Sequence, residues 1–153
     1  MSEKSIFTRI AEGEIPAAKI REDEQFFAIL DLFPTTRGMT LVIPKKQIPS
    51  DIFLMDDLFY SDYLLATKKV VEILKKGFGV SRVGAIIEGM EINHAHIKLY
   101  PLRGVGEERK PMTGGPATLR FDIYPGYMQS GHGPQQNLSD LQSLADEIIS
   151  KNK

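Results

Sequence analysis

Hydrophobic residues recur at helical spacing in three segments of the chain. The longest segment runs from Asp56 to about Lys76, where apolar positions follow one another at intervals of three and four residues and predict an amphipathic helix. Its apolar stripe consists of Phe59, Tyr63, Ala66, Val70, Ile73 and Leu74. Asp56 and Asp57 suit the positive end of this helix, and Gly77 is expected to cap its other end.

Two shorter segments show the same spacing near the ends of the chain. Residues 5–12 predict one short helix that stops at Gly13. The sequence from Ser139 to Gln142 has the pattern of a capping box, and a closing helix is expected to follow from it. The buried side of that helix would consist of Leu141, Leu144, Ala145 and Ile148.

Between the helices, short runs of β-branched and aromatic residues bounded by turn residues predict strands. The expected strands span residues 17–21, 25–31, 39–44, 82–88 and 91–101, with a further short strand at 118–124. The first two should form a hairpin, and the two on either side of Gly89 should pair antiparallel. The segments 103–116 and 125–134 show no periodicity, and the first is interpreted as a surface loop or as a lid over a site.

Two of the three histidines lie in the expected strand at 91–101. Because side chains alternate between the faces of a strand, His94, His96 and Lys98 would share one face, with neighbours roughly 6–7 Å apart. A phosphate group or a metal ion could then touch two or three of them. Two imidazoles beside an ammonium group favour an anion.

Three interpretations of this polar row remain open at this point. The row could be the solvent-exposed face of an antiparallel strand. It could bind zinc, although the chain has no cysteine and its only other imidazole, His132, lies in a glycine-rich segment. Phosphate chemistry needs fewer partners, because one neutral imidazole can attack phosphorus while neighbouring donors hold the oxygens.

The composition narrows the class of protein. With 153 residues, 42% of them hydrophobic and 25% charged, the chain is expected to form a single domain over residues 1–153. A formal net charge of −1 argues against nucleic acid and membranes as partners and favours a small ligand. No apolar run is long enough to span a membrane and the first residues do not resemble a signal peptide, so a cytoplasmic protein is expected.

Several motifs, taken in order, resemble the histidine triad (HIT) superfamily of nucleotide hydrolases and transferases, and the likeness runs over most of the chain. It is carried by Ile6-Phe7 with Ile10, by residues 13–17, by residues 28–31 with Pro34 and Gly38, by residues 40–46, and by His94-Ala95-His96-Ile97. The ordered set is far more specific than an isolated His-x-His pair. The resemblance implies an α+β fold with a five-stranded antiparallel sheet, one long helix, a short N-terminal helix and a C-terminal helix, commonly paired into a homodimer.

The resemblance also implies roles for individual residues. In the family the motif reads His-x-His-x-His, and its middle histidine, here His96, is the nucleophile that forms a nucleotidyl-imidazole intermediate. His94 matches the first position, which orients the nucleophile by hydrogen bonding, and Asp31 matches the position that contacts the ribose hydroxyls. Taken alone, Asp31 suits an Asx turn equally well. The positions that enclose the base are matched by Phe7, Ile10, Ile29 and Leu32, for which simple core packing is the alternative.

The chain departs from the family pattern at four positions. Lys98 stands where the third histidine would be, and Met90 stands where a glutamine often helps to bind phosphate. Met39 replaces a common histidine and Thr8 a common cysteine, so the zinc site of some members is not expected here. We expect neither a metal nor another cofactor.

The leading hypothesis is an enzyme that acts on a small-molecule nucleotide. It would cleave at the α-phosphate of a nucleoside phosphoramidate or a dinucleoside polyphosphate, with His96 attacking, His94 holding it and Lys98 stabilising the developing charge. The alternative is a nucleotide-binding or regulatory protein with weak or no catalysis, because Lys98 replaces the third histidine.

Overall fold

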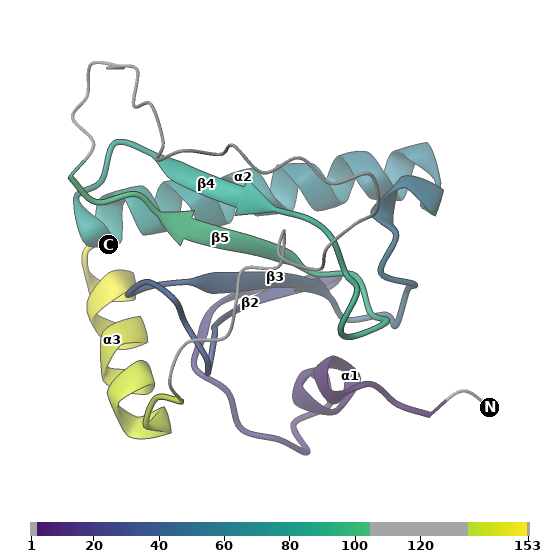
Figure 1. Ribbon diagram of the computed structural model, residues 1–153, viewed down its shortest axis with the longest axis horizontal. Coiled ribbons are helices and arrows are strands. Elements are labelled where there is room, and N and C mark those ends of the chain that lie inside the picture. The colour runs from purple at the N-terminus through teal and green to yellow at the C-terminus, as the bar shows by residue number, and fades with distance from the viewer. Residues whose placement is uncertain (1–2, 105–134, 153) are drawn as a thin grey trace, which may run out of the picture.

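A computed structural model describes residues 3–104 and 135–152. Five strands form one antiparallel sheet in the order β1-β2-β3-β5-β4 (Figure 1). The strands span Lys19–Glu22 (β1), Phe26–Leu30 (β2), Thr40–Pro44 (β3), Val83–Ile86 (β4) and Ile97–Pro101 (β5). The helices span Ile6–Ala11 (α1), Asp57–Phe78 (α2) and Leu138–Ser150 (α3), and a short 3-10 helix spans Ile52–Leu54 (η1). The predicted α+β class and the antiparallel sheet with its three helices are therefore confirmed.

The two faces of the sheet are covered by different helices. In Figure 1, α2 runs along one face of the sheet, while α1 lies on the other side. Alternate residues of each central strand therefore enter different clusters: Phe26, Ala28 and Leu30 of β2 pack toward α2 and α3, whereas Phe27 and Ile29 pack toward α1. Every residue of β2 and β3 is buried, because both strands are covered on both faces.

The long helix α2 is held at both ends as its sequence predicts, with one correction. The Asp56 side chain accepts a hydrogen bond from the backbone N–H of Phe59 at the start of the helix. The predicted C-cap, Gly77, was wrong: the cap is Gly79, which has a left-handed φ of 61°. Gly77 lies in the last turn, where a Cβ atom would stand 2.6 Å from the Ile148 side chain, so it permits the close approach of α3.

The closing helix α3 packs against α2 and β1, and its predicted buried residues Leu141, Ala145 and Ile148 are buried. The predicted capping box starting at Ser139 was wrong. The helix begins two residues earlier, because Asn137 accepts the hydrogen bond of the Ser139 backbone N–H and acts as the N-cap.

The two histidines precede β5 instead of lying within it, so the predicted strand at 91–101 was too long. Backbone hydrogen bonds of this segment run to a loop, since the Ala95 N–H donates to the Ile48 carbonyl at 2.9 Å and the Ser50 N–H donates to the Asn93 side chain at 3.0 Å. The strand expected at 82–88 is likewise shorter, and the connection between β4 and β5 spans residues 87–96.

Several expectations lie outside the described residues. They are the strand at 118–124, the segment at 125–134 with His132, and almost all of the segment at 103–116. In the part of the chain that the structure describes, no helix is long and apolar enough to cross a membrane.

Candidate active site

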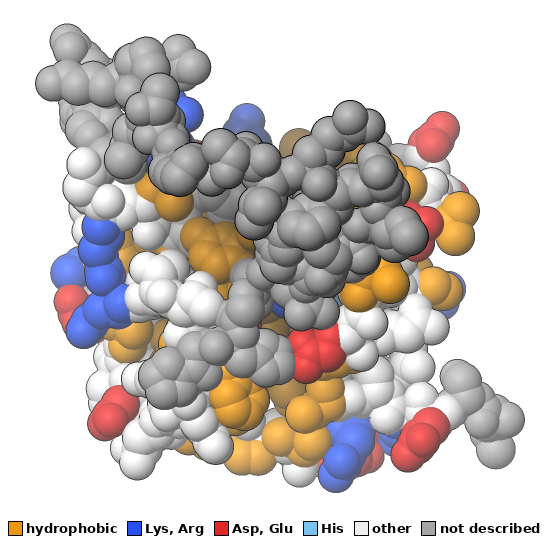
Figure 2. Space-filling view, in the orientation of Figure 1, with side chains coloured by type: hydrophobic (Ala, Val, Ile, Leu, Met, Phe, Trp, Pro, Cys, Tyr) orange, Lys and Arg blue, Asp and Glu red, His pale blue; other side chains and the backbone are white. Residues whose placement is uncertain are grey.

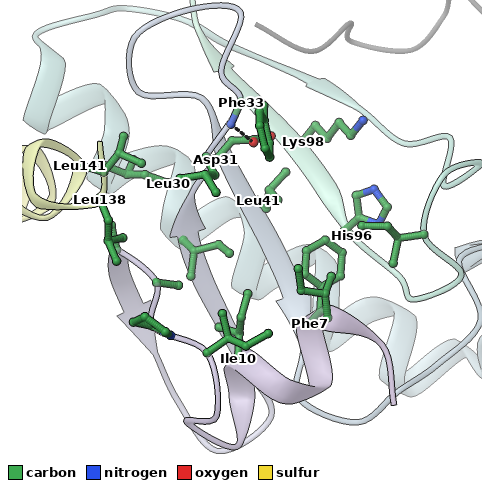
Figure 3. A pocket seen from close by; sticks show the side chains of 18 of the residues that line it. Phe7, Ile10, Leu30, Asp31, Phe33, Leu41, His96, Lys98, Leu138 and Leu141 are labelled. Carbon is green, nitrogen blue, oxygen red and sulfur yellow. Dashed lines mark hydrogen bonds between the residues drawn. The ribbon is translucent and has the colours of Figure 1, made fainter. Parts of the chain in front are cut away.

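A pocket of about 320 Å³ lies between α1, the sheet and the first turn of α3 (Figure 3). Most of its lining is hydrophobic, and the polar side chains that line it are Asp31, Glu91, His96 and Lys98. Seven of the eight predicted site residues line this pocket: Phe7, Ile10, Ile29, Asp31, Leu32, His96 and Lys98. The eighth, His94, lies behind them. On the face that carries α1, Figure 2 shows hydrophobic side chains grouped between charged ones that lie mostly toward the edges of the molecule.

His96 is held in one tautomer by its own backbone neighbour. Its Nδ1 lies 2.7 Å from the carbonyl oxygen of His94. A carbonyl oxygen can only accept, so Nδ1 carries the proton and the neutral ring has its lone pair on Nε2. Burial lowers the pKa of His96 below its ordinary value, and the Lys98 charge adds to this effect, while the His94 carbonyl opposes it. The neutral, nucleophilic form of the ring is therefore favoured at neutral pH.

His94 is fully buried, and both of its ring nitrogens have hydrogen bonds. Nε2 donates to the Pro44 carbonyl at 2.8 Å, which leaves Nδ1 to accept from the Ser5 hydroxyl at 2.6 Å. Burial lowers the pKa of His94, while the Pro44 carbonyl partly opposes this shift. The ring thus braces the segment whose carbonyl orients His96, and it does not itself line the pocket.

Three residues that the sequence did not single out for the site surround His94. The Ser5 hydroxyl also accepts from the Thr8 N–H at 3.1 Å, as the N-cap of α1. Gln47 Oε1 accepts from the Ser5 N–H at 2.9 Å and from the Thr8 hydroxyl at 2.8 Å. Ser5 and His94 are 89 positions apart, so only the helix start at Ser5 leaves a local signal in the sequence.

Lys98 lies on β5, opposite Leu41 of β3 and Ile86 of β4, and is only 7% exposed. Among the residues that the structure describes, no hydrogen bond or ion pair holds its ammonium group. Figure 3 shows its side chain extending along the same wall of the pocket as His96. The ammonium group lies at the wall of a largely apolar pocket, and an anion offsets a cation well in such surroundings, so the position favours a negatively charged ligand. The interpretation of the polar row as a solvent-exposed strand face was wrong.

Asp31 follows β2 at the pocket wall, where its side chain forms an Asx turn; its contact with a ribose stays a prediction. One oxygen, Oδ1, accepts from the Phe33 N–H at 2.8 Å and forms the Asx turn (Figure 3). The same side chain lines the pocket. The second carboxylate oxygen is therefore the one suited to a ligand hydroxyl.

Tyr100 is a further residue of this region that the sequence did not single out. It follows Lys98 by two positions on β5, so both side chains project from the same face of the sheet. Burial raises the pKa of Tyr100 to about 12, and the carboxylates of Asp31 and Glu88 contribute. Its hydroxyl is buried and has no hydrogen-bond partner among the described residues. Alternation along the predicted strand is the signal that could have placed it with Lys98.

The metal interpretation requires His94, but hydrogen bonds occupy both of its ring nitrogens. Within residues 3–104 and 135–152, no three His, Cys, Asp or Glu side chains converge in a way that could hold a metal ion. The remaining imidazole of the chain, His132, is outside these ranges.

Comparison with known proteins gives the family. The HIT domain model matches residues 12–104. An uncharacterized HIT-like protein of Methanocaldococcus jannaschii is 38% identical over 107 residues, which cover 67% of this chain and 82% of that protein. The adenosine 5′-monophosphoramidase of Saccharomyces cerevisiae is 31% identical over 113 residues, covering 73% of this chain and 70% of that protein. A crystal structure of a HIT-like protein from Bartonella henselae covers 99% of this chain and 98% of its own at a TM-score of 0.68 and 22% identity.

The fold and the site together define a class of small α+β domains in which a buried histidine faces an apolar pocket. The family match extends over more than half of the chain, so this chain belongs to the HIT domain family. The predicted superfamily is confirmed. Three yeast relatives are named adenosine 5′-monophosphoramidases.

Proposed function

We propose that this chain cleaves the bond between the α-phosphate of a nucleotide and its leaving group, with a nucleoside 5′-phosphoramidate as the first substrate to test. A dinucleoside polyphosphate is the second. The observation that carries the proposal is the 2.7 Å hydrogen bond between His96 Nδ1 and the His94 carbonyl. It leaves the Nε2 lone pair of a neutral ring as the nucleophile beside the pocket.

The remaining pocket residues suit the other parts of such a substrate. The hydrophobic side chains from α1, β2 and β3 offer two sides of an apolar slot for a base, with Phe7 and Ile10 facing Ile29 and Leu41 in one cluster. Asp31 can accept a hydrogen bond from a ribose hydroxyl. Lys98 places a positive charge where phosphate oxygens would lie beside His96.

The proposed reaction has two steps. In the first, His96 Nε2 forms a bond to phosphorus while the bond from phosphorus to the leaving nitrogen or oxygen breaks, and the leaving atom takes a proton from the Lys98 ammonium group. In the second, water attacks phosphorus, the phosphorus–nitrogen bond to His96 breaks, and the proton released by water returns to Lys98. The products are a nucleoside monophosphate and the free amine or phosphate compound.

Replacement of His96 tests this mechanism directly. His96→Gly should lower turnover of adenosine 5′-phosphoramidate on the order of 10⁴-fold or more. Added imidazole should restore part of the activity, because it can enter the space of the missing ring and act as a free nucleophile. Unchanged turnover in His96→Gly would refute the assignment of the nucleophile.

The same assay separates the enzyme from the alternative, a nucleotide-binding protein with weak or no catalysis. If the unmodified chain binds AMP by calorimetry but turns over neither substrate, the binding function is supported. In that case, the missing catalysis would be attributed to the replacement of the third histidine by Lys98.

The homodimer remains a prediction. Strand β4 lies at the edge of the sheet, and a group of large hydrophobic residues near the start of α2 is exposed: Phe53, Leu54 and Leu58 are between 74% and 78% exposed. Sedimentation equilibrium measures the mass in solution, and a monomer at all concentrations would contradict the prediction.

A further inference from the structure

The C-terminal helix α3 contributes to the pocket although it lies outside the region that defines the family. The HIT domain match ends at residue 104, and α3 spans Leu138–Ser150. Two residues of its first two turns, Leu138 and Leu141, line the same pocket as His96 and Lys98. In Figure 3 these leucines lie at one end of the pocket, and His96 and Lys98 lie at the other.

Contacts at both ends of α3 fix this wall in place. Before the helix, the Gln136 N–H donates to the Leu32 carbonyl at 3.0 Å, which joins the entry of α3 to the turn that carries Asp31. After the helix, the Lys151 ammonium donates to the Gly77 carbonyl at 3.1 Å. Leu141 is only 7% exposed and belongs to the main core. Leu141 is therefore part of the packed core, and the helix holds Leu138 three positions before it.

The order of groups along the pocket indicates which part of a nucleotide would meet α3. If the phosphate lies at His96 and Lys98 and the ribose at Asp31, the base extends toward the opposite end. Every other residue that lines that end is apolar, since the polar lining residues are Asp31, Glu91, His96 and Lys98. Leu138 is 37% exposed, so it retains surface that a planar base can cover.

We propose that Leu138 and Leu141 form a base-selecting wall at the far end of the nucleotide site. This inference rests on the proposed function and adds a specificity rule to it. The wall selects by size and apolar contact, because it offers no polar side chain to recognise the base edges. A purine long enough to reach Leu138 is favoured over a pyrimidine, and a substituent on the outer edge of the purine meets the wall.

The test compares adenosine 5′-phosphoramidate with its N6-benzyl derivative and with the cytidine compound. Leu138→Ala should raise KM for the adenosine compound about three- to tenfold with kcat nearly unchanged, because truncation of an apolar contact removes uniform binding. The cytidine compound, which does not reach the wall, should change less than twofold. The N6-benzyl compound should gain at least about tenfold in kcat/KM relative to adenosine, since the truncation makes room for it.

Leu144→Ala is the matched control. Leu144 lies on the same helix and packs partly against the main core, but it does not line the pocket that contains His96. It lines a neighbouring groove beside Arg37 and Glu147, to which Leu141 also contributes. Leu144→Ala should keep the base preference of the unmodified chain. The proposed wall would be overturned if the unmodified chain and both variants, Leu138→Ala and Leu144→Ala, had the same base preference.

Failure of the proposed function gives a different result. If the unmodified chain turns over none of the three compounds, the comparison moves to calorimetry with AMP, N6-benzyl-AMP and CMP. The same change of preference in Leu138→Ala would then support the wall without the chemistry. Absence of binding of all three nucleotides would overturn both proposals.

Discussion

The two faces of the sheet differ in whether their buried polar side chains have hydrogen-bond partners. On the α2 face, the buried polar side chains Thr40 and Thr67 each donate to a nearby carbonyl, that of Gly38 at 2.9 Å and that of Tyr63 at 2.8 Å. On the α1 face, the described residues provide no partner for the buried hydroxyl of Tyr100 and none for the ammonium of Lys98, which lines the pocket. Unmet hydrogen-bonding capacity is expensive in a protein interior. Its concentration beside the pocket indicates that one face is built for stability and the other for a ligand.

Truncation of a core side chain should give the largest difference in stability between the two faces. Leu74 is fully buried in the core on the α2 face. Leu74→Ala should lower the unfolding free energy by about 3–5 kcal/mol, because the surrounding core cannot collapse into the cavity. Leu41→Ala on the α1 face should cost less, since Leu41 already borders the pocket. Urea unfolding of both variants measures the difference. Equal losses would mean that the α1 face is packed as tightly as the other.

Lys98→Met should have opposite effects on activity and stability. Removal of the cation should lower kcat on the order of 10²- to 10³-fold, because developing negative charge loses its stabilising partner. The unfolding free energy should stay the same or rise, because a buried charge without a described partner is replaced by an apolar chain of similar length. Leu99→Met, on the other face of β5, is the control and should leave kcat unchanged. A large loss of stability in Lys98→Met would show that the lysine serves the fold.

Acid should destabilise the protein through the α1 face. The pKa values of His94 and His96 are both lowered, chiefly by burial, so the unfolded chain binds their protons more readily than the folded chain does. Their contribution to stability is complete above the ordinary pKa of 6.5 and is lost as the pH falls from that value through the lower folded pKa values. Urea unfolding between pH 7.5 and 5 should show this decline, and His96→Gln should reduce its slope. An identical slope in that variant would contradict the assignment to His96.

The faces also differ in how far the sequence could predict them. The α2 face follows from periodicity alone, because the stripe from Phe59 to Leu74 repeats at helical spacing. The family resemblance pointed to Phe7, Ile10, Ile29 and Leu32, all of which line the pocket. Their roles toward a nucleotide remain predictions.

What the sequence did not reveal depends on contacts between distant segments. The predicted strand wrongly included His94 and His96. No local sequence pattern shows that this segment forms hydrogen bonds with the loop at 48–50. The Ser5–His94 hydrogen bond spans 89 positions, and the place of Leu138 in the pocket depends on how α3 folds back over the sheet. Such contacts have no periodic signal.

Two of the helix N-caps, Ser5 and Asn137, allow a matched comparison of the same capping hydrogen bond on different helices. Ser5→Ala and Asn137→Ala should each cost about 1 kcal/mol of stability, because each removes a side chain that accepts a backbone N–H at a helix start. Only Ser5→Ala should also lower kcat and shift the acid limb of the pH–rate profile, because the Ser5 hydroxyl donates to His94. Ser5→Thr should restore the profile. A normal profile in Ser5→Ala would limit Ser5 to capping.

The last comparison concerns two tyrosines whose hydroxyls are buried on opposite sides of the sheet, and it includes the smallest single effect, that of Tyr100→Phe. The Tyr63 hydroxyl donates to the Val42 carbonyl at 2.6 Å, so Tyr63→Phe should cost about 1–2 kcal/mol by leaving a buried acceptor without its partner. The Tyr100 hydroxyl has no partner within residues 3–104 and 135–152, so Tyr100→Phe should change the unfolding free energy by less than about 0.5 kcal/mol or raise it. Urea unfolding of both variants measures the contrast. If Tyr100→Phe costs as much as Tyr63→Phe, the α1 face satisfies its polar groups as fully as the α2 face, and the distinction between a stabilising face and a ligand face fails.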